Sequence, residues 1–242
     1  MNLNELKKEL LSHLLKRNVI RTAETPDKFF KFKSGRMSPN FINLGILNSG
    51  KDLELLSKSM ASFAVDLVNS QQIASFKHVF GPAYKGIPLA TALGIGLSQH
   101  GLDVGVMYDR KEEKGHGDPS ADKLIMGSHA FNPGDSIVMV DDVITTGGTK
   151  LDALEKLKLL GDHKLVGLIV IVDRQEKMGG VGTKEDPIGE KSAVQALDEA
   201  GIKTFSLLNA QDIFDACKPL ISEQVKQSWL EYYDKYGVVK LT

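Results

Sequence analysis

IVMVDDVITTGGT, residues 137–149, is the stretch that decides the fold. A run of apolar residues is followed by two carboxylates, and a turn with two glycines then leads into an amphipathic helical pattern over residues 151–160. This order predicts a buried strand that ends in a turn before a helix. In an open α/β sheet ligands bind at that edge, and glycines allow backbone N–H groups at the helix N-terminus to surround a phosphate. The segment therefore predicts a phosphate-binding loop.

The acidic pair Asp141 and Asp142 distinguishes this loop from the common nucleotide-binding loops. No Gly-Lys-Ser/Thr follows it and no G-x-G-x-x-G is present, so a Walker loop and a dinucleotide fingerprint are both disfavoured. Carboxylates repel a phosphate, whereas ribose hydroxyls donate hydrogen bonds to carboxylates and lie close to a 5-phosphate. The pair therefore indicates a sugar phosphate as ligand. The alternative is an ordinary turn in which the carboxylates only cap a helix.

Outward from this segment, helical and strand patterns alternate along the chain. Helices are expected over residues 1–17, from 52, over 87–100 and 151–160, and then from 191 onward with two closing helices, the second over 223–236. Strands are expected over residues 78–80, 104–108, 137–140, 165–172 and 204–208. Such alternation is what a mainly parallel sheet flanked by helices requires.

Three stretches depart from this alternation. Residues 28–33 and 40–46 look like two short strands of a small antiparallel flap around a turn-rich stretch. Residues 109–128 and 175–190 fit neither helix nor strand and are expected to be exposed loops. Long exposed loops in compact enzymes are often functional.

Composition and charge limit the classes of partner. The 242 residues carry a formal net charge of -1, which argues against broad electrostatic binding to nucleic acid or to an anionic membrane. No run approaches the roughly 20 apolar residues that cross a bilayer, and the N-terminus lacks the apolar core of a signal peptide. Cys217 is the only cysteine, which excludes an intramolecular disulfide and fits a reducing cytoplasm. Its side chain is expected to be a packing group rather than a reactive thiol.

A cationic segment, residues 110–118, follows the predicted strand 104–108. Arg110, Lys111 and Lys114 place three cations close together, and His116 lies between two glycines. A mobile lid of this composition can close over a polyanion such as pyrophosphate and exclude water. Cations already placed at the departing oxygens lower the barrier to loss of such a group. The alternative is a solvated charged loop that its own glutamates neutralise.

Residues 140–149 resemble the motif by which type I phosphoribosyltransferases bind 5-phosphoribosyl 1-pyrophosphate (PRPP). The resemblance implies that Asp141 and Asp142 hold the ribose hydroxyls, with Asp142 counted among the catalytic residues. It implies a loop for the 5-phosphate made of Val143, Ile144, Thr145, Thr146, Gly147, Gly148 and Thr149. The implied fold is that of the type I phosphoribosyltransferases, an α/β fold with a central mainly parallel sheet flanked by helices and a small N-terminal hood.

Further segments resemble the orotate phosphoribosyltransferases within this family. They are FKSGRMSPNF at residues 32–41, FGPAYKGIP at 80–88 and DRQE at 173–176. By this resemblance Lys33 contacts PRPP, and Tyr84 and Lys85 meet its pyrophosphate. The implied orotate contacts are Asn40, Phe41, Thr145 and Arg174. Without the resemblance these segments would be a hairpin with a basic turn, a solvent-exposed lysine and a surface Asp–Arg pair.

The cationic segment resembles the flexible catalytic loop of the same enzymes. That resemblance assigns the leading catalytic role to Lys114, and a role as proton donor or hydrogen-bond partner to His116. Arg110, Lys114 and His116 would serve the PRPP of the neighbouring subunit in a homodimer, whereas Lys111 would act in its own subunit. Asp118 stands where that loop usually has Glu.

The resemblance implies one domain over residues 1–242, with a hood of about residues 1–50 plus C-terminal elements and a PRPP-binding core of about residues 51–175. The implied reaction joins orotate to PRPP and yields orotidine 5'-monophosphate and pyrophosphate, in de novo pyrimidine biosynthesis. The implied cofactor is Mg²⁺, held mainly by PRPP and water without a direct protein ligand. The expected enzyme is a cytoplasmic homodimer that binds neither nucleic acid nor membrane. A phosphoribosyltransferase for another base and a regulator that senses PRPP are the alternatives.

Overall fold

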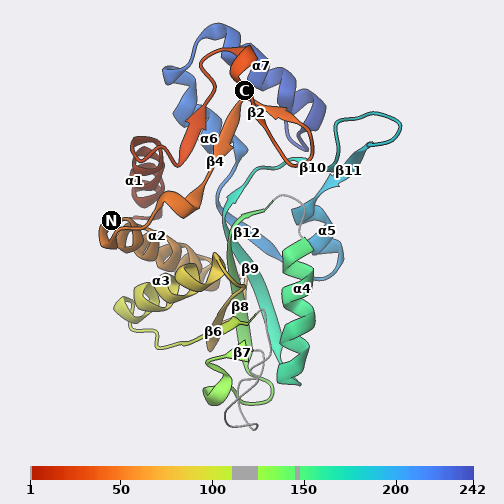
Figure 1. Ribbon diagram of the computed structural model, residues 1–242. Coiled ribbons are helices and arrows are strands. Elements are labelled where there is room, and N and C mark those ends of the chain that lie inside the picture. Colours follow the sequence, from red (N-terminus) through yellow and green to blue (C-terminus); the bar gives the residue numbers. More distant parts are fainter. Residues whose placement is uncertain (1, 111–124, 145–147) are drawn as a thin grey trace.

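The computed structural model describes residues 2–110, 125–144 and 148–242. A six-stranded sheet forms its centre, with helices on both faces (Figure 1). In spatial order the strands are β12 (Thr204–Leu208), β9 (Lys164–Asp173), β8 (Ser136–Ile144), β5 (His78–Gly81), β6 (Gly105–Asp109) and β7 (Ile125–Met126). The first five run parallel to one another, and β7 is antiparallel to β6. The predicted mainly parallel α/β sheet is confirmed.

The sheet changes its direction of growth at β5. Strand β6 pairs with one side of β5, where Tyr108 lies opposite Gly81, and β8 pairs with the other side, where Met139 lies opposite Phe80. The carboxyl ends of β5 and β8 therefore flank a topological switch point, which is where open α/β sheets bind ligands. The predicted phosphate-binding segment begins at this point, because β8 ends at Ile144.

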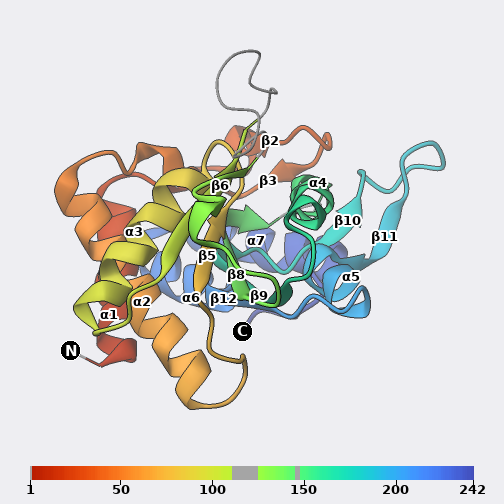
Figure 2. The ribbon, with the colours of Figure 1, turned by 90° about the horizontal axis from the view of Figure 1, so that it is seen from below.

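Helices cover the two faces of the sheet separately (Figure 2). One face carries α2 (Gly50–Asn69) and α3 (Gly86–Gln99), with α1 (Leu3–Lys16) packed on α2. The other face carries α4 (Gly148–Leu157) and α5 (Ala193–Glu199). Short 3₁₀ helices are η1 (Pro26–Lys28), η2 (Leu44–Ile46), η3 (Ser128–Ala130), η4 (Lys158–Leu160) and η5 (Lys218–Leu220). No helix in the described parts of the chain combines the length and the apolar character needed to span a membrane.

The side chains of β8 alternate between two hydrophobic clusters. Val138 and Val140 belong to the cluster on the α2 and α3 face, whereas Ile137 and Met139 belong to the cluster under α4 and α5. Successive residues of a strand point to opposite faces, so the two carboxylates that continue β8 also diverge. Asp142, the second of them, points toward the start of α3.

The hood lies at the carboxyl edge of the large sheet and combines both ends of the chain (Figure 1). It contains the antiparallel pairs β1 (Ile20–Thr22) with β4 (Asn40–Ile42) and β2 (Phe30–Lys31) with β3 (Met37–Ser38), together with α6 (Ala210–Cys217) and α7 (Glu223–Tyr236). The predicted pairing of residues 28–33 with 40–46 is wrong. A tight turn at Gly35, with a φ of 79°, closes the β2–β3 hairpin early, and β4 then pairs with β1, a strand too short to show a periodic pattern.

The two predicted loops are partly strands. Residues 175–190 contain β10 (Lys177–Gly179) and the start of β11 (Ile188–Ser192), which form an antiparallel hairpin that projects from the body (Figure 1). Arg36 stabilises its first strand, because the buried guanidinium donates hydrogen bonds to four consecutive backbone carbonyls, those of residues 177–180. In the other predicted loop, residues 125–126 form β7, and residues 111–124 lie outside the described part. Short strands held by distant side chains leave little local pattern.

Candidate functional site

The site residues come together because parallel strands end at one edge of the sheet. The lysine turn, residues 81–86, follows β5, and the acidic pair closes β8. Asp109 and Arg110 stand at the end of β6, and Arg174 follows β9. Four neighbouring strands thus deliver residues from distant parts of the sequence to one edge, below the hood.

The lysine turn meets the acidic pair directly. Nζ of Lys85 lies 2.6 Å from Oδ2 of Asp142, and the lysine side chain is 61% exposed whereas that of Asp142 is 11% exposed. Asp141 is buried, and its Oδ1 accepts a hydrogen bond from the backbone N–H of Asp142 at 2.8 Å. The Lys85 cation and the Asp142 carboxylate therefore meet at the switch point, with the cation still in contact with solvent.

The glycines of the lysine turn are required by close packing. A Cβ atom on Gly81 would lie 2.1 Å from the carbonyl oxygen of Gly86, a contact that no larger residue tolerates. The N–H of Gly86 donates to the carbonyl of Pro82 at 2.9 Å, and the peptide bond between Ala83 and Tyr84 is cis. Tyr84 is 67% exposed at the tip of the turn. The turn thus presents Tyr84 and the following lysine to solvent in front of α3.

Arg174 is buried and already paired. Its Nη2 lies 2.6 Å from Oε1 of Glu176, its Nη1 donates to Oδ1 of Asn40 at 2.8 Å, and its Nη2 donates to Oγ of Ser38 at 3.1 Å. The ring of Phe32 covers the guanidinium at 4.7 Å. Burial acts to lower the pKa of the Arg174 guanidinium, but Glu176 together with Tyr233 and Tyr232 outweighs this effect, so the pKa is raised above its usual range. The alternative of a surface Asp–Arg pair is wrong, because Arg174 is only 4% exposed.

The surroundings of Arg174 contain a second buried guanidinium and the carboxylates of Glu176 and Asp173. Glu176 also lies 3.8 Å from Nη1 of Arg36 and accepts a hydrogen bond from the hydroxyl of Tyr232 at 3.1 Å. Both guanidiniums are buried, so two cations share one carboxylate. The planar Arg174 guanidinium can pair with the oxygens of a planar anion in place of one of its present acceptors. Sequence reasoning missed Glu176, Ser38 and Arg36 as members of this network, although all three lie within the segments that carried the resemblance.

Two other predicted hood residues occupy different environments. Lys33 is exposed. Phe41 is half-buried, and its ring centroid lies 5.7 Å from that of Phe30 and 6.3 Å from that of Phe32. The guanidinium of Arg21 stands over the same ring at 5.0 Å. Phe41 therefore belongs to an aromatic cluster with Phe30 and Phe32, and Phe32 also covers the guanidinium of Arg174.

The remaining predicted residues are partly outside the described chain. Val143 and Ile144 close β8, half-buried and buried respectively, and residues 148 and 149 begin α4. Arg110 is half-buried, and its carbonyl accepts a hydrogen bond from Lys156 at 3.2 Å. Residues outside the description include the predicted ligands Lys111, Lys114, His116, Thr145, Thr146 and Gly147. Among the residues that are described, no three His, Cys, Asp or Glu side chains gather into a group able to hold a metal ion.

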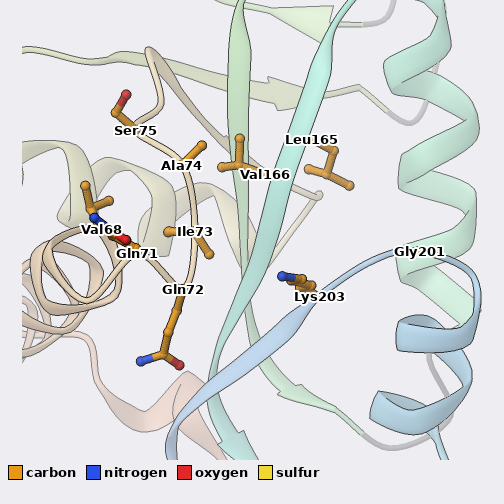
Figure 3. Close-up of a pocket in the computed structure, with 10 residues that line it drawn as sticks. All are labelled: Val68, Gln71, Gln72, Ile73, Ala74, Ser75, Leu165, Val166, Gly201 and Lys203. Atoms are coloured by element: carbon orange, nitrogen blue, oxygen red, sulfur yellow. The ribbon is translucent and has the colours of Figure 1, made fainter.

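A surface hollow lies away from this edge. It measures about 630 Å³ and is lined by residues that include Ile73, Val166 and Lys203 (Figure 3). Val166 stands near the start of β9, so the hollow is at the amino edge of the sheet, opposite the acidic pair. Its lining mixes aliphatic groups with the polar ends of Gln72 and Lys203 and brings no carboxylate to it. The hollow is therefore separate from the candidate site at the carboxyl edge of the sheet.

The fold and the site define a class of protein, the phosphoribosyltransferases. The Phosphoribosyl transferase domain matches residues 47–185, a span that contains the lysine turn, the cationic segment, the acidic pair and Arg174. This match covers more than half of the chain. The predicted family resemblance of residues 140–149 is confirmed at this level.

Within that class, the chain belongs to the orotate phosphoribosyltransferase family. It is 35% identical over 218 residues to an orotate phosphoribosyltransferase of Bifidobacterium adolescentis, covering 86% of this chain and 90% of that one. It is 31% identical over 240 residues to one of Clostridium botulinum, covering 96% and 97%. A crystal structure of orotate phosphoribosyltransferase from Francisella tularensis is similar with a TM-score of 0.74 at 28% identity, covering 95% of this chain and 99% of that one.

Proposed function

We propose that this protein transfers the 5-phosphoribosyl group of PRPP to orotate, which yields orotidine 5'-monophosphate and pyrophosphate for de novo pyrimidine biosynthesis. Family membership supports the reaction. The observation that carries it is the juxtaposition of two unlike sites at one sheet edge. Asp142 with Lys85 suits a ribose bearing phosphates, and the Arg174 network suits a planar anion.

PRPP is proposed to span the switch point. The carboxylates of Asp141 and Asp142 accept hydrogen bonds from the ribose 2- and 3-hydroxyls, and Tyr84 and Lys85 meet the pyrophosphate. The phosphate loop, residues 143–149, receives the 5-phosphate at the start of α4, where backbone N–H groups favour an anion. Lys33 is proposed to reach PRPP from the hood, since its side chain is exposed there.

The reaction exchanges one bond at ribose C1 for another. The bond from C1 to the pyrophosphate oxygen breaks, and N1 of the orotate anion bonds to C1. No side-chain nucleophile is needed, because the substrate supplies its own. The protein positions two anions on opposite sides of the sugar and stabilises the charge that develops on the leaving group. The proposed stabilising residues are Lys85 with Arg110, Lys111, Lys114 and His116 of the cationic segment.

Orotate is proposed to bind in the hood. Its carboxylate and ring oxygens suit the Arg174 guanidinium, and an oxygen of the base would take the place of Asn40 Oδ1 as acceptor at Nη1. Phe41 lies in the adjoining aromatic cluster and can cover the ring of the base. Thr145 is included from the family resemblance. Uracil lacks the carboxylate and would lose that part of the pairing.

We also propose Mg²⁺ as cofactor, with the protein acting as a homodimer in the cytoplasm. Mg²⁺ keeps several waters and binds substrate phosphates, so it is proposed to be held mainly by the pyrophosphate of PRPP and by water, without a direct protein ligand. When bound it would neutralise charge on that group. The resemblance of the cationic segment to a loop that serves a neighbouring subunit supports the dimer. The single, buried Cys217 is compatible with a reducing compartment.

The test is consumption of orotate, followed by its ultraviolet absorbance with purified protein, PRPP and Mg²⁺. Uracil, hypoxanthine and adenine are supplied separately as competing bases. Turnover of orotate alone is expected. Turnover of another base would mean that the protein is a phosphoribosyltransferase with a different base as substrate. PRPP binding without turnover of any base would favour a regulator that senses PRPP.

A further inference from the structure

An ion pair beside the proposed PRPP site joins β6 to α4 and also contacts the lysine turn. Asp109, the last residue of β6, is buried at 5% exposure. Its Oδ1 accepts a hydrogen bond from the backbone N–H of Ala83 in the lysine turn at 2.5 Å. Its Oδ2 accepts one from Nζ of Lys156 on α4, and the same Nζ donates to the carbonyl of Arg110 at 3.2 Å.

The carboxylate of Asp109 supplies an acceptor that the sheet cannot supply. The ladder between β5 and β6 ends where Gly81 lies opposite Tyr108. Beyond that point the lysine turn leaves the sheet, and the N–H of Ala83 has no strand carbonyl to meet. A buried donor without an acceptor is costly, so Asp109 stabilises this course of the turn. The next residue along the turn is Tyr84, followed by Lys85.

The other end of the ion pair belongs to a different part of the ligand site. Lys156 lies on α4, the helix that follows the phosphate loop. The lysine turn is proposed to hold the pyrophosphate on C1 of PRPP, and the phosphate loop to hold the phosphate on C5. A salt bridge between β6 and α4 that also ties down the lysine turn therefore relates the two ends of the binding site to each other.

We propose that Asp109 and Lys156 are positioning residues for PRPP, which set the spacing between the lysine turn and α4 without touching the substrate. This inference rests on the proposed function. A buried ion pair adds little net stability compared with well-packed apolar residues. The role of this pair is therefore to fix the position of the lysine turn relative to α4. Misplacing a binding group by about 1 Å can cost on the order of 10²-fold in rate. PRPP, which needs both ends at once, is affected more than orotate.

Three substitutions and a matched control test this. Asp109→Asn and Lys156→Met break the pair, and Lys156→Arg can keep it. The control is Asp135→Asn, which breaks a second pair of a buried carboxylate with a lysine, at 2.7 Å from Lys77, before the amino end of β8. For each protein we would measure KM for PRPP, KM for orotate at saturating PRPP, Kd for pyrophosphate by calorimetry, and Tm.

The expected result is a rise of about tenfold in KM for PRPP for Asp109→Asn and Lys156→Met, with a smaller rise in Kd for pyrophosphate, which occupies only one end of the site. KM for orotate is expected to change less than about twofold, and Lys156→Arg to restore most of the PRPP affinity. Asp135→Asn is expected to lower Tm without changing either KM. The Lys156 side chain is 29% exposed, so its variants can fold even if Asp109→Asn does not.

Two outcomes would overturn the inference. If the wild-type protein turns over PRPP and the Asp109 and Lys156 variants match Asp135→Asn in both KM values, the pair is merely structural. If KM for PRPP and KM for orotate rise equally, the pair does not act on PRPP. A wild-type protein that neither binds pyrophosphate nor turns over PRPP would remove the proposed function itself, and the inference with it.

Discussion

Nζ of Lys85 lies 2.6 Å from Oδ2 of Asp142, so the last residue before α3 and the second carboxylate of β8 form an ion pair across the switch point. Both residues are proposed to contact PRPP, through its pyrophosphate and its ribose. The lysine side chain is 61% exposed, and such half-solvated pairs contribute little to stability. A ligand that brings hydroxyls for the carboxylate and phosphate oxygens for the ammonium can therefore separate them at low cost. The pair holds both groups in place until that ligand arrives.

Replacement of Asp142 by asparagine tests the ribose contact. Asp142→Asn keeps the shape of the side chain but removes the charge that receives the sugar hydroxyls. Hydrogen bonds to charged groups contribute about 1.5–3 kcal/mol, so kcat/KM for PRPP is expected to fall by roughly 10- to 100-fold. Initial rates over a range of PRPP concentrations measure this. Asp162→Asn, at an exposed position before β9, is the control. Equal kcat/KM in the two variants would remove Asp142 from the site.

Replacement of Lys114 tests the cationic segment. The residue lies outside the described chain, so this prediction depends on the sequence resemblance alone. Lys114→Ala is expected to lower kcat by roughly 10²- to 10³-fold, as loss of one preorganised charge-stabilising group does elsewhere. PRPP binding should survive, which calorimetry can show. Lys184→Ala, in the exposed loop between β10 and β11, should leave both quantities unchanged. Unchanged turnover in Lys114→Ala would remove the cationic segment from the mechanism.

The pairing of Arg174 with Glu176 predicts a coupled loss of stability. Both side chains are buried, so Arg174→Met leaves the Glu176 carboxylate without its nearest cation. Breaking a buried pair in this way costs about 3–5 kcal/mol of unfolding free energy. Urea denaturation measures it. Adding Glu176→Gln to Arg174→Met should recover part of the loss. If the losses of unfolding free energy in the two single variants simply add in the double variant, the two groups do not interact.

Asp52 predicts acid sensitivity at the junction of α1 and α2. Burial acts to raise the pKa of Asp52, but hydrogen bonds from Ser49 and His13 and the charge of Arg17 outweigh it and hold that pKa well below its usual range. A carboxyl group whose pKa is lower in the folded than in the unfolded state stabilises the fold above the unfolded pKa of about 4. This contribution is lost as the pH falls from there toward the folded-state pKa. Denaturation at several pH values measures this.

The difference in unfolding free energy between the wild type and Asp52→Asn should therefore be largest near neutral pH and should narrow below about pH 4. Asp66→Asn, at an exposed position on the same helix, should show no such narrowing. A difference that stays constant from neutral pH to pH 3 would contradict the assignment.

Cys217 is expected to be inert in the folded protein. Burial raises the pKa of its thiol to about 12, so the reactive thiolate is scarce at neutral pH. A thiol reagent at pH 8 should label the native protein slowly and the urea-unfolded protein completely. Fast labelling of the native protein would show that the C-terminal helices open readily.

The prediction of the five parallel strands of the large sheet succeeded because each of them has a local signature, whereas β7 lies within the predicted loop of residues 109–128. Residues 165–172 are apolar throughout, as a strand buried on both faces must be, and β9 is observed there as Lys164–Asp173. The prediction failed in the hood. Strands β1, β2 and β3 have two or three residues each. The turn at Gly35, rather than any periodic sequence pattern, determines which strands pair. Local patterns need several residues to be visible.

The sequence by itself determined the class of protein and the residues proposed for PRPP, because the acidic pair and the lysine turn are short contiguous segments in which chemistry follows residue order. Only the tertiary structure decided what lies beside them. The hydrogen bonds of Arg174 to residues 38 and 40, and the bridge from Asp109 to Lys156, join positions 136, 134 and 47 residues apart, respectively. Such contacts arise when parallel strands end at one edge and the hood folds over it. No local pattern encodes which side chains then meet.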